Sequence, residues 1–202
     1  EDIAKIPCNV EVASEYRYRN PIILEKTLFV AISQSGETAD TLEALIAAKK
    51  IDSTIYTLCI CNSDGSSITR NSDLIFLTHA GPEIGVASTK AFTTQLVALA
   101  LLTCSIGVSK KTIDKEREKS IVQGLTLLPG LINECLLEEY KIIRIAKQFK
   151  NKNNALFIGR GTMHAIAMEG ALKLKEITYI HAESYPAGEL KHGPIALIDD
   201  SI

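Results

Sequence analysis

The sequence has 202 residues, a formal net charge of −2 at pH 7 and 46% hydrophobic residues. This length suits one large or two small globular cores. Because the charge is near neutral and the basic residues are scattered, we expect no nucleic-acid partner. The most apolar segment has an uninterrupted apolar stretch only from Leu96 to Leu102. A bilayer-spanning helix needs about 20 residues, so we expect no membrane partner either.

The cysteines indicate a reducing compartment. They are odd in number, irregularly spaced and without a C-x-x-C pair: Cys8, Cys59, Cys61, Cys104 and Cys135. We interpret all of them as small buried hydrophobes and expect a cytoplasmic protein, since no signal or transit peptide is visible. The chain starts at Glu1 and stops at Ile202 within a strand-like pattern. We therefore expect an excerpt of a longer polypeptide.

Strand-like runs at residues 28–32, 54–60, 74–78 and 155–158 alternate with helical patterns. This alternation predicts an α/β fold with parallel strands and helices on both faces of the sheet. A polar cluster at residues 62–67 marks the loop after the second strand, and a short helix is expected before Asp73. The pattern from Thr112 to Lys150 predicts a helical bridge, interrupted at Pro129-Gly130, between two α/β units.

The first strand ends in Ser33-Gln-Ser-Gly-Glu-Thr38, directly before an amphipathic helix pattern. Ligands of open α/β sheets bind outside the carboxyl ends of strands, and helix N-terminal N–H groups favour anions. Three hydroxyls without a lysine suit the terminal phosphate of a small metabolite such as a sugar phosphate. The alternative is a simple helix cap. Glu37 and Asp40 favour that alternative unless their carboxylates point away, so both interpretations stay open.

A second turn follows the third strand and feeds a helix, with Ser88 and Thr89 where a cap belongs. Loops after neighbouring parallel strands meet at one edge of a sheet, so this turn could face the Ser33–Thr38 turn across a shared pocket. A capped helix without a ligand is an equal alternative. Gly159-Arg-Gly161 lacks the third glycine of a dinucleotide fingerprint, and we interpret it as a tight strand-to-helix turn.

Glu169, Lys173 and Glu176 are spaced four and three residues apart and should form one charged stripe on a helix. The stripe is flanked by Ile166, Leu172 and Ile177, which predicts partial burial and perturbed pKa values. A carboxylate so placed could move a proton between adjacent carbons of a sugar phosphate. On spacing alone, ordinary helix salt bridges are the favoured alternative.

The segment after this helix contains His181, Glu183 and His192 among glycines and prolines. His192 is expected in a loop, where a histidine is a candidate acid–base group because its ordinary pKa lies near neutrality. Zinc is a weak competitor, since these residues show no recognised ligand spacing.

Taken together, residues 10–19, 33–41, 83–95, 169–183 and 188–194 resemble, in order, the isomerase half of glutamine–fructose-6-phosphate aminotransferase, also called glucosamine-6-phosphate synthase. The resemblance implies two sugar-isomerase (SIS) domains in tandem, each a three-layer αβα structure with a parallel sheet. It assigns residues 1–110 to a first SIS domain without its first strand and helix, 111–154 to a helical connection, and 155–202 to the start of a second SIS domain.

The same resemblance implies conversion of fructose 6-phosphate and ammonia to glucosamine 6-phosphate without a cofactor or metal. Ser33, Gln34, Ser35 and Thr38 would hold the phosphate, and Val86 and Ser88 would contact the sugar. Glu176 would move the proton between C1 and C2, Lys173 would assist at the sugar oxygens, and His192 would open the ring in the neighbouring subunit of a homodimer. Ammonia would come from an N-terminal glutaminase domain.

Because several parts of that enzyme are missing from these residues, we expect no turnover by this chain alone. A non-catalytic SIS module that senses a sugar phosphate remains an alternative, as does a glutamine-independent sugar-phosphate isomerase or deglycase. The joint presence of Glu176, Lys173 and His192 favours the enzyme, because a sensor needs neither a base nor a ring-opening group.

Overall fold

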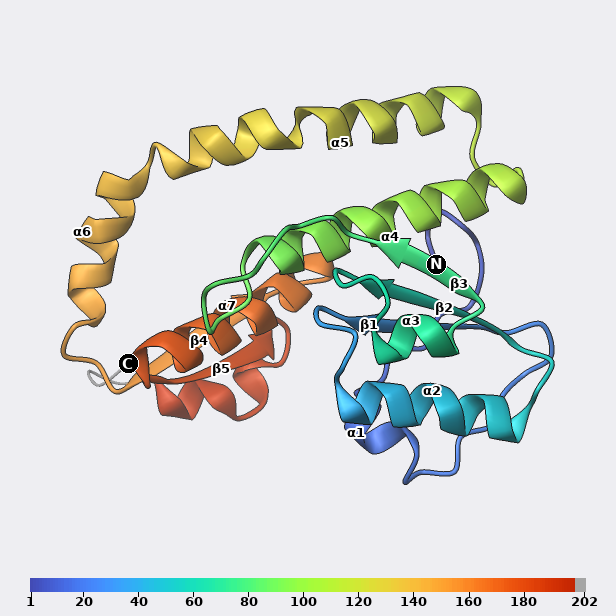
Figure 1. Ribbon diagram of the computed structural model, residues 1–202. Coiled ribbons are helices and arrows are strands. Elements are labelled where there is room, and N and C mark those ends of the chain that lie inside the picture. Colours follow the sequence, from blue (N-terminus) through green and yellow to red (C-terminus); the bar gives the residue numbers. More distant parts are fainter. Residues whose placement is uncertain (199–202) are drawn as a thin grey trace. The chain divides into compact units, whose positions relative to one another are not determined.

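The computed structural model describes residues 1–198 (Figure 1). The chain divides into two compact units, residues 1–127 and 128–202. The boundary between these units falls inside a helix, α5 (Lys115–Leu136). The domain limits expected from the sequence, 1–110, 111–154 and 155–202, remain a proposal.

The first unit is built on a parallel three-stranded sheet with strand order β1-β2-β3. Leu28 pairs with Tyr56 and Leu58 pairs with Leu74 at the start of each ladder. The three expected strands and the short helix before Asp73 are therefore confirmed. The elements in chain order are α1 (Ala13–Tyr16), β1 (Leu28–Ser33), α2 (Ala39–Ile51), β2 (Tyr56–Cys61), α3 (Ser67–Asn71), β3 (Leu74–Leu77) and α4 (Lys90–Ser109).

Helices α2 and α3 cover one face of this sheet (Figure 1). Strand side chains alternate between faces, so Ala31, Cys59 and Cys61 all point toward this side. They pack against Leu45 of α2 and Ile68 of α3 in a fully buried cluster. Cys59 and Cys61 are thus core residues, as expected, and Cys104 of α4 is buried as well.

Helix α4 covers the opposite face, where Leu58 and Ile60 of β2 pack against Ala98. The first unit is therefore a three-layer αβα structure, as predicted. By length and composition alone, α4 would also fit a bilayer. Its contact with the sheet accounts for part of that apolar composition, although only 22% of the apolar window is buried.

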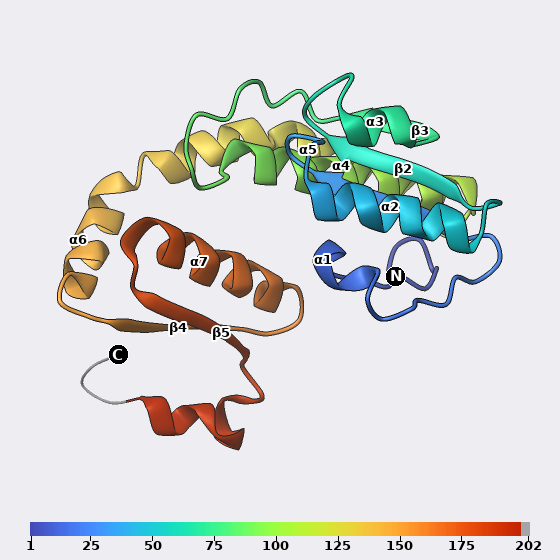
Figure 2. The same cartoon turned by 60° about the horizontal axis from the view of Figure 1, so that its bottom comes forward.

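The second unit contains a parallel pair of strands covered on one face by a helix (Figure 2). Ala155, Ala182 and Ala171 are buried between the strands and this helix, and their small side chains allow close packing. The elements are α6 (Glu139–Phe149), β4 (Asn154–Gly159), α7 (Thr162–Thr178), β5 (His181–Pro186) and the 3-10 turns η1 (Leu190–His192) and η2 (Pro194–Leu197).

The turn from β4 to α7 has the tight geometry expected from the sequence. A Cβ on Gly159 would lie 2.2 Å from the carbonyl oxygen of Met163, so only glycine fits there. Gly161 has a φ of +57°, which is readily available to glycine alone.

Two expectations about local structure are wrong, and one strand was not predicted. The helical bridge is not interrupted at Pro129-Gly130, because α5 runs through both residues and the break lies at Leu137-Glu138. A proline inside a helix removes one backbone hydrogen bond and its ring crowds the preceding turn, which can bend a helix without ending it. Strand β5 was not predicted, because its outward face carries polar side chains. Cys8 and Cys135 are exposed rather than buried, although all five cysteines are free.

Candidate functional site

The hydroxyls of the Ser33–Thr38 turn converge in the structure. Ser33 is the buried last residue of β1, and its Oγ lies 2.8 Å from the Oγ1 of Thr38. It also accepts the N–H of Gly36 at 3.1 Å, while the Oγ of Ser35 accepts the N–H of Glu37 at 3.1 Å. Thr38 precedes α2, but its side chain makes no capping hydrogen bond. A simple capped helix therefore does not account for these three hydroxyls.

The carboxylate of Glu37 points away from the hydroxyls, which removes the main argument against an anion at this turn. It accepts the backbone N–H of Ser67, at the start of α3, at 2.8 Å. Hydrogen bonds from Ser67 hold the pKa of Glu37 below its ordinary value. The carboxylate of Asp40 lies 3.5 Å from the guanidinium of Arg17, which offsets its charge.

Gly36 fixes the close approach of this turn to α3. Its φ is +67°, and a Cβ at this position would lie 2.0 Å from the Oγ of Ser66. Its carbonyl oxygen accepts the N–H of Ile68 at 3.0 Å. The turn is thus held against α3 by backbone contacts that no other residue type would allow.

The loop before α4 is held by Glu83. The Glu83 carboxylate accepts the N–H of Ala91 at 3.0 Å and the hydroxyl of Thr89 at 3.1 Å. These bonds, chiefly the one from Ala91, lower the pKa of Glu83. The cap expected from Ser88 and Thr89 is therefore wrong: Thr89 precedes the helix, but its hydroxyl donates to Glu83 instead of capping.

The two expected sugar-contacting residues lie within this loop, between Glu83 and Thr89. The side chain of Val86 is fully exposed, and Ser88 is half-buried. Because β1 and β3 are parallel members of one sheet, their following loops lie at the same carboxyl edge. The loop that contains Val86 and Ser88 therefore starts at the same carboxyl edge as the Ser33–Thr38 turn, and a pocket shared by the two remains a prediction.

In the second unit, α7 brings together the expected charged stripe. The Nζ of Lys173 lies 2.7 Å from Oε2 of Glu176 and 3.6 Å from Oε1 of Glu169. The exposed fractions of the Glu169, Lys173 and Glu176 side chains are 24%, 23% and 36%, so the expected partial burial is present. The hydrogen bond to Glu176 raises the pKa of Lys173 above its ordinary value, and this amine is protonated at neutral pH.

His192 ends the turn η1 and is exposed. Within residues 1–198 it makes no hydrogen bond or ion pair with the charged stripe of α7. His181, Glu183 and Tyr185 line up on the outward face of β5, where the Tyr185 hydroxyl donates to Glu183. No group of three or more possible metal ligands gathers in the described part of the chain.

The profile of the SIS domain family matches residues 1–105 and 148–201, which is more than half of the sequence. The chain belongs to the SIS domain family. Residues 106–147, which the profile leaves out, contain all of α5 and most of α6.

Among individual SIS proteins, the chain is 58% identical over 199 residues to the glutamine–fructose-6-phosphate aminotransferase (isomerizing) of Pseudomonas syringae. That alignment covers 98% of this chain and 32% of the relative. The enzyme of the same name from Francisella tularensis is 52% identical over 202 residues, covering 100% of this chain and 33% of the relative. The chain thus spans about a third of the length of the curated relatives it matches.

The solved structures agree with this family. The C-terminal domain of glucosamine-fructose-6-phosphate aminotransferase from Francisella tularensis superposes with a TM-score of 0.94 at 51% identity, covering 98% of this chain and 56% of that one. A glucosamine-6-phosphate deaminase from Thermotoga maritima superposes with a TM-score of 0.71 at 24% identity, covering 94% and 55%. At that identity the second likeness concerns the SIS fold alone.

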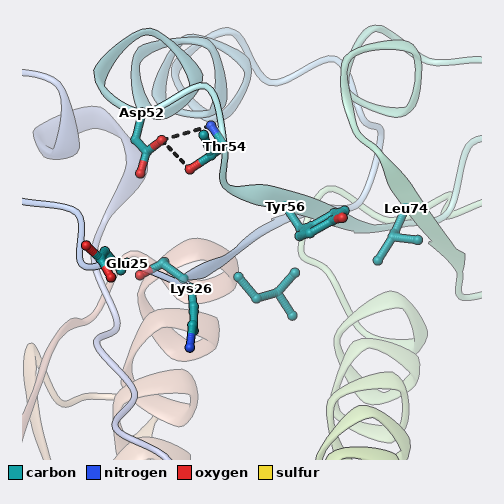
Figure 3. Close-up of a pocket in the computed structure, with 8 residues that line it drawn as sticks. Glu25, Lys26, Asp52, Thr54, Tyr56 and Leu74 are labelled. Carbon is teal, nitrogen blue, oxygen red and sulfur yellow. Dashed lines mark hydrogen bonds between the residues drawn. The ribbon is translucent and has the colours of Figure 1, made fainter.

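One pocket of the first unit lies away from the Ser33–Thr38 turn. It measures about 760 Å³ and is lined by the first residues of all three strands of the first unit, Leu28, Tyr56 and Leu74 (Figure 3). Its polar wall includes Asp52, whose carboxylate accepts the N–H and hydroxyl of Thr54. Because it lies at the amino ends of the strands, this pocket is at the edge of the sheet opposite the Ser33–Thr38 turn.

Proposed function

We propose that these SIS residues belong to the isomerase half of a glutamine–fructose-6-phosphate aminotransferase, which converts fructose 6-phosphate and ammonia to glucosamine 6-phosphate. The names of the relatives support this proposal, and so does the convergence of Ser33 and Thr38 at the carboxyl end of β1. That convergence is the main structural observation, because it supplies neutral donors beside a helix N-terminus that has no side-chain cap.

In this proposal the Ser33–Thr38 turn holds the 6-phosphate. Ser33, Ser35 and Thr38 donate hydroxyl hydrogen bonds, Gln34 adds its side chain, and the first N–H groups of α2 face the anion. Val86 and Ser88 contact the sugar from the neighbouring loop.

The chemical step requires a net transfer of a proton from C1 to C2. Ammonia first condenses with the C2 ketone, forming an imine and releasing water. Glu176 then removes a proton from C1 and returns it to C2, while the proton of the C1 hydroxyl passes to the imine nitrogen, so that C1 becomes the aldehyde carbon and the imine becomes the C2 amine. Lys173, which is protonated and hydrogen-bonded to Glu176, donates to the sugar oxygens as negative charge develops there.

Further parts of the proposal concern partners. His192 opens the sugar ring in the site of the neighbouring subunit of a homodimer, and a glutaminase domain supplies the ammonia. Free cysteines fit a reducing compartment, so we place the protein in the cytoplasm.

The native gene product should therefore form glucosamine 6-phosphate from fructose 6-phosphate with glutamine or an ammonium salt. A sugar-phosphate sensor would bind fructose 6-phosphate without turnover. A glutamine-independent isomerase would convert the sugar phosphate with no nitrogen donor present. Either of these two results would contradict the proposed activity.

A further inference from the structure

Asn62, the residue directly after β2, is hydrogen-bonded to the loops that follow both neighbouring strands. Its N–H donates to the carbonyl oxygen of Gln34 at 3.0 Å. Its Oδ1 accepts the N–H of Ala80 at 2.7 Å and the hydroxyl of Thr78 at 3.3 Å. Its Nδ2 donates to the carbonyl oxygen of Gly81 at 2.7 Å. The side-chain oxygen and nitrogen of Asn62 are therefore both hydrogen-bonded to the loop after β3, while its backbone N–H is hydrogen-bonded to the turn after β1.

The loop after β3 has a conformation that needs this support. His79 lies between the Thr78 and Ala80 partners of Asn62 and has a φ of +51°. Residues other than glycine rarely adopt this left-handed conformation, because it brings the Cβ close to the backbone. The bonds from Asn62 on either side of His79 offset this cost.

The far end of the same loop is fixed independently. Glu83 accepts hydrogen bonds from Thr89 and Ala91 at the start of α4. The Val86–Ser88 segment therefore lies between two fixed positions. One is Gly81, which is hydrogen-bonded to Asn62, and the other is the start of α4. We therefore expect the bond between Asn62 and Gly81 to help set the distance between this segment and the Ser33–Thr38 turn.

We infer that Asn62 is a positioning residue that sets the spacing between the Ser33–Thr38 turn and the Val86–Ser88 segment, and thereby the preference for a sugar phosphate over inorganic phosphate. This inference rests on the proposed function. Inorganic phosphate needs only the turn, whereas fructose 6-phosphate needs the turn and the segment at the correct separation. Loss of the Asn62 side chain should therefore lower the affinities for the two ligands by different factors.

The test compares dissociation constants of the native gene product for fructose 6-phosphate and inorganic phosphate by calorimetry. In Asn62→Ala the preference for fructose 6-phosphate should fall by about tenfold, the effect expected when a hydrogen-bonded tie is lost. Affinity for inorganic phosphate should stay within about threefold of wild type. Asn71→Ala is the matched control, since Asn71 also donates its Nδ2 to a backbone carbonyl, that of Ser67 at 2.8 Å. It should leave the preference unchanged.

Asn62→Asp adds a readout that a general loss of structure would not give. Its carboxylate can still accept from Ala80, but it cannot donate to Gly81 until it is protonated. The preference for fructose 6-phosphate, normalised to wild type at each pH, should be low at pH 8 and recover partly at pH 5. Asn62→Ala should show no such recovery. If Asn62→Ala does not fold, Asn62→Asp at pH 8 provides the same comparison of ligands.

Two results would overturn the inference while leaving the proposed function intact: an unchanged preference in the Asn62 variants, or an equal loss of affinity for both ligands. A wild-type protein that binds neither ligand would instead overturn the proposed function, and the inference with it.

Discussion

The side-chain oxygens of Ser33 and Thr38 lie 2.8 Å apart, although Ser33 ends a strand and Thr38 precedes a helix. A hydroxyl can rotate to donate to a new acceptor, so both groups can turn toward one phosphate. We expect Ser33→Ala and Thr38→Val each to weaken fructose 6-phosphate binding by about 1–3 kcal/mol. Because the two hydroxyls act together, the double variant should lose less than the sum of the single losses.

Calorimetric titration of the native gene product measures this coupling. Thr126→Val is a suitable control, because Thr126 lies exposed on α5 and its hydroxyl bonds only within that helix. Losses that add fully, or unchanged affinity in both single variants, would argue against a shared phosphate site.

Two glycines with the same φ allow the cost of backbone strain to be measured separately from the cost of a steric clash. Gly36 and Gly65 both have a φ of +67°, but a Cβ on Gly36 would clash with Ser66, whereas a Cβ on Gly65 would meet nothing within 4 Å beyond its chain neighbours. Gly65→Ala should cost about 1–2 kcal/mol of stability through strain alone. Gly36→Ala should cost more and should also abolish phosphate binding, because the turn must move away from α3. Chemical denaturation and phosphate titration of both variants measure this difference, and equal effects at the two positions would contradict it.

Asp73 makes part of the stability depend on pH. Its carboxylate accepts the N–H and hydroxyl of Thr57 and lies 3.0 Å from the Nζ of Lys49. These bonds, chiefly that from the Thr57 hydroxyl, lower its pKa from 3.8 to about 2. A lowered pKa stabilises the folded state above pH 3.8, and this contribution is lost as the pH falls toward 2.

The Asp73 side chain is 40% exposed, so solvent screening limits the contribution. We expect Asp73→Asn to lower the free energy of unfolding at pH 7 by about 1 kcal/mol and to flatten its dependence between pH 4 and 2. Asp2→Asn, in an ion pair whose Asp side chain is 95% exposed, is the control. Urea unfolding across this pH range measures the effect, and an unaltered slope in Asp73→Asn would contradict the assignment.

The proposed sharing of His192 between subunits can be tested by mixing two inactive variants. A dimer of one Glu176→Gln subunit and one His192→Ala subunit has one site that keeps both native groups. With random pairing, co-expression should therefore restore about a quarter of wild-type activity. No recovery in dimers shown to contain both subunits would mean that each subunit uses its own histidine.

Much of the architecture could be predicted from local patterns. The strands at residues 28–32 and 74–78 and the turn at Ser33–Thr38 were recognisable because apolar runs stop abruptly at polar turn residues. Strand β5 was not predicted, because polar side chains (His181, Glu183 and Tyr185) occupy its outward face. The strand therefore has no apolar run that would mark it, although Ala182 is buried. The break in the helical bridge was placed at Pro129 because a proline in a helical pattern usually marks a kink or an end. Helix α5 instead continues through this residue.

The candidate site was harder to complete from the sequence. The hydroxyls of its turn share one short segment, so their spacing was visible. The side chains of Glu83, Asn62 and Glu37 make hydrogen bonds between residues from 6 to 30 positions apart. No periodic pattern in the sequence predicts these bonds. The only available signal was an acidic or amide side chain within a turn, which has many other causes.

The most direct test of the account is Glu176→Gln in the native gene product. The amide keeps the size of the side chain and can still accept from Lys173, but it cannot take a proton from C1. We expect a loss of at least about 100-fold in kcat for glucosamine 6-phosphate formation, with fructose 6-phosphate affinity within about threefold of wild type. Glu139→Gln on α6, a helical glutamate outside the charged stripe, should keep full activity. Near-normal turnover in Glu176→Gln would reduce the charged stripe of α7 to a structural ion pair and contradict the proposed mechanism.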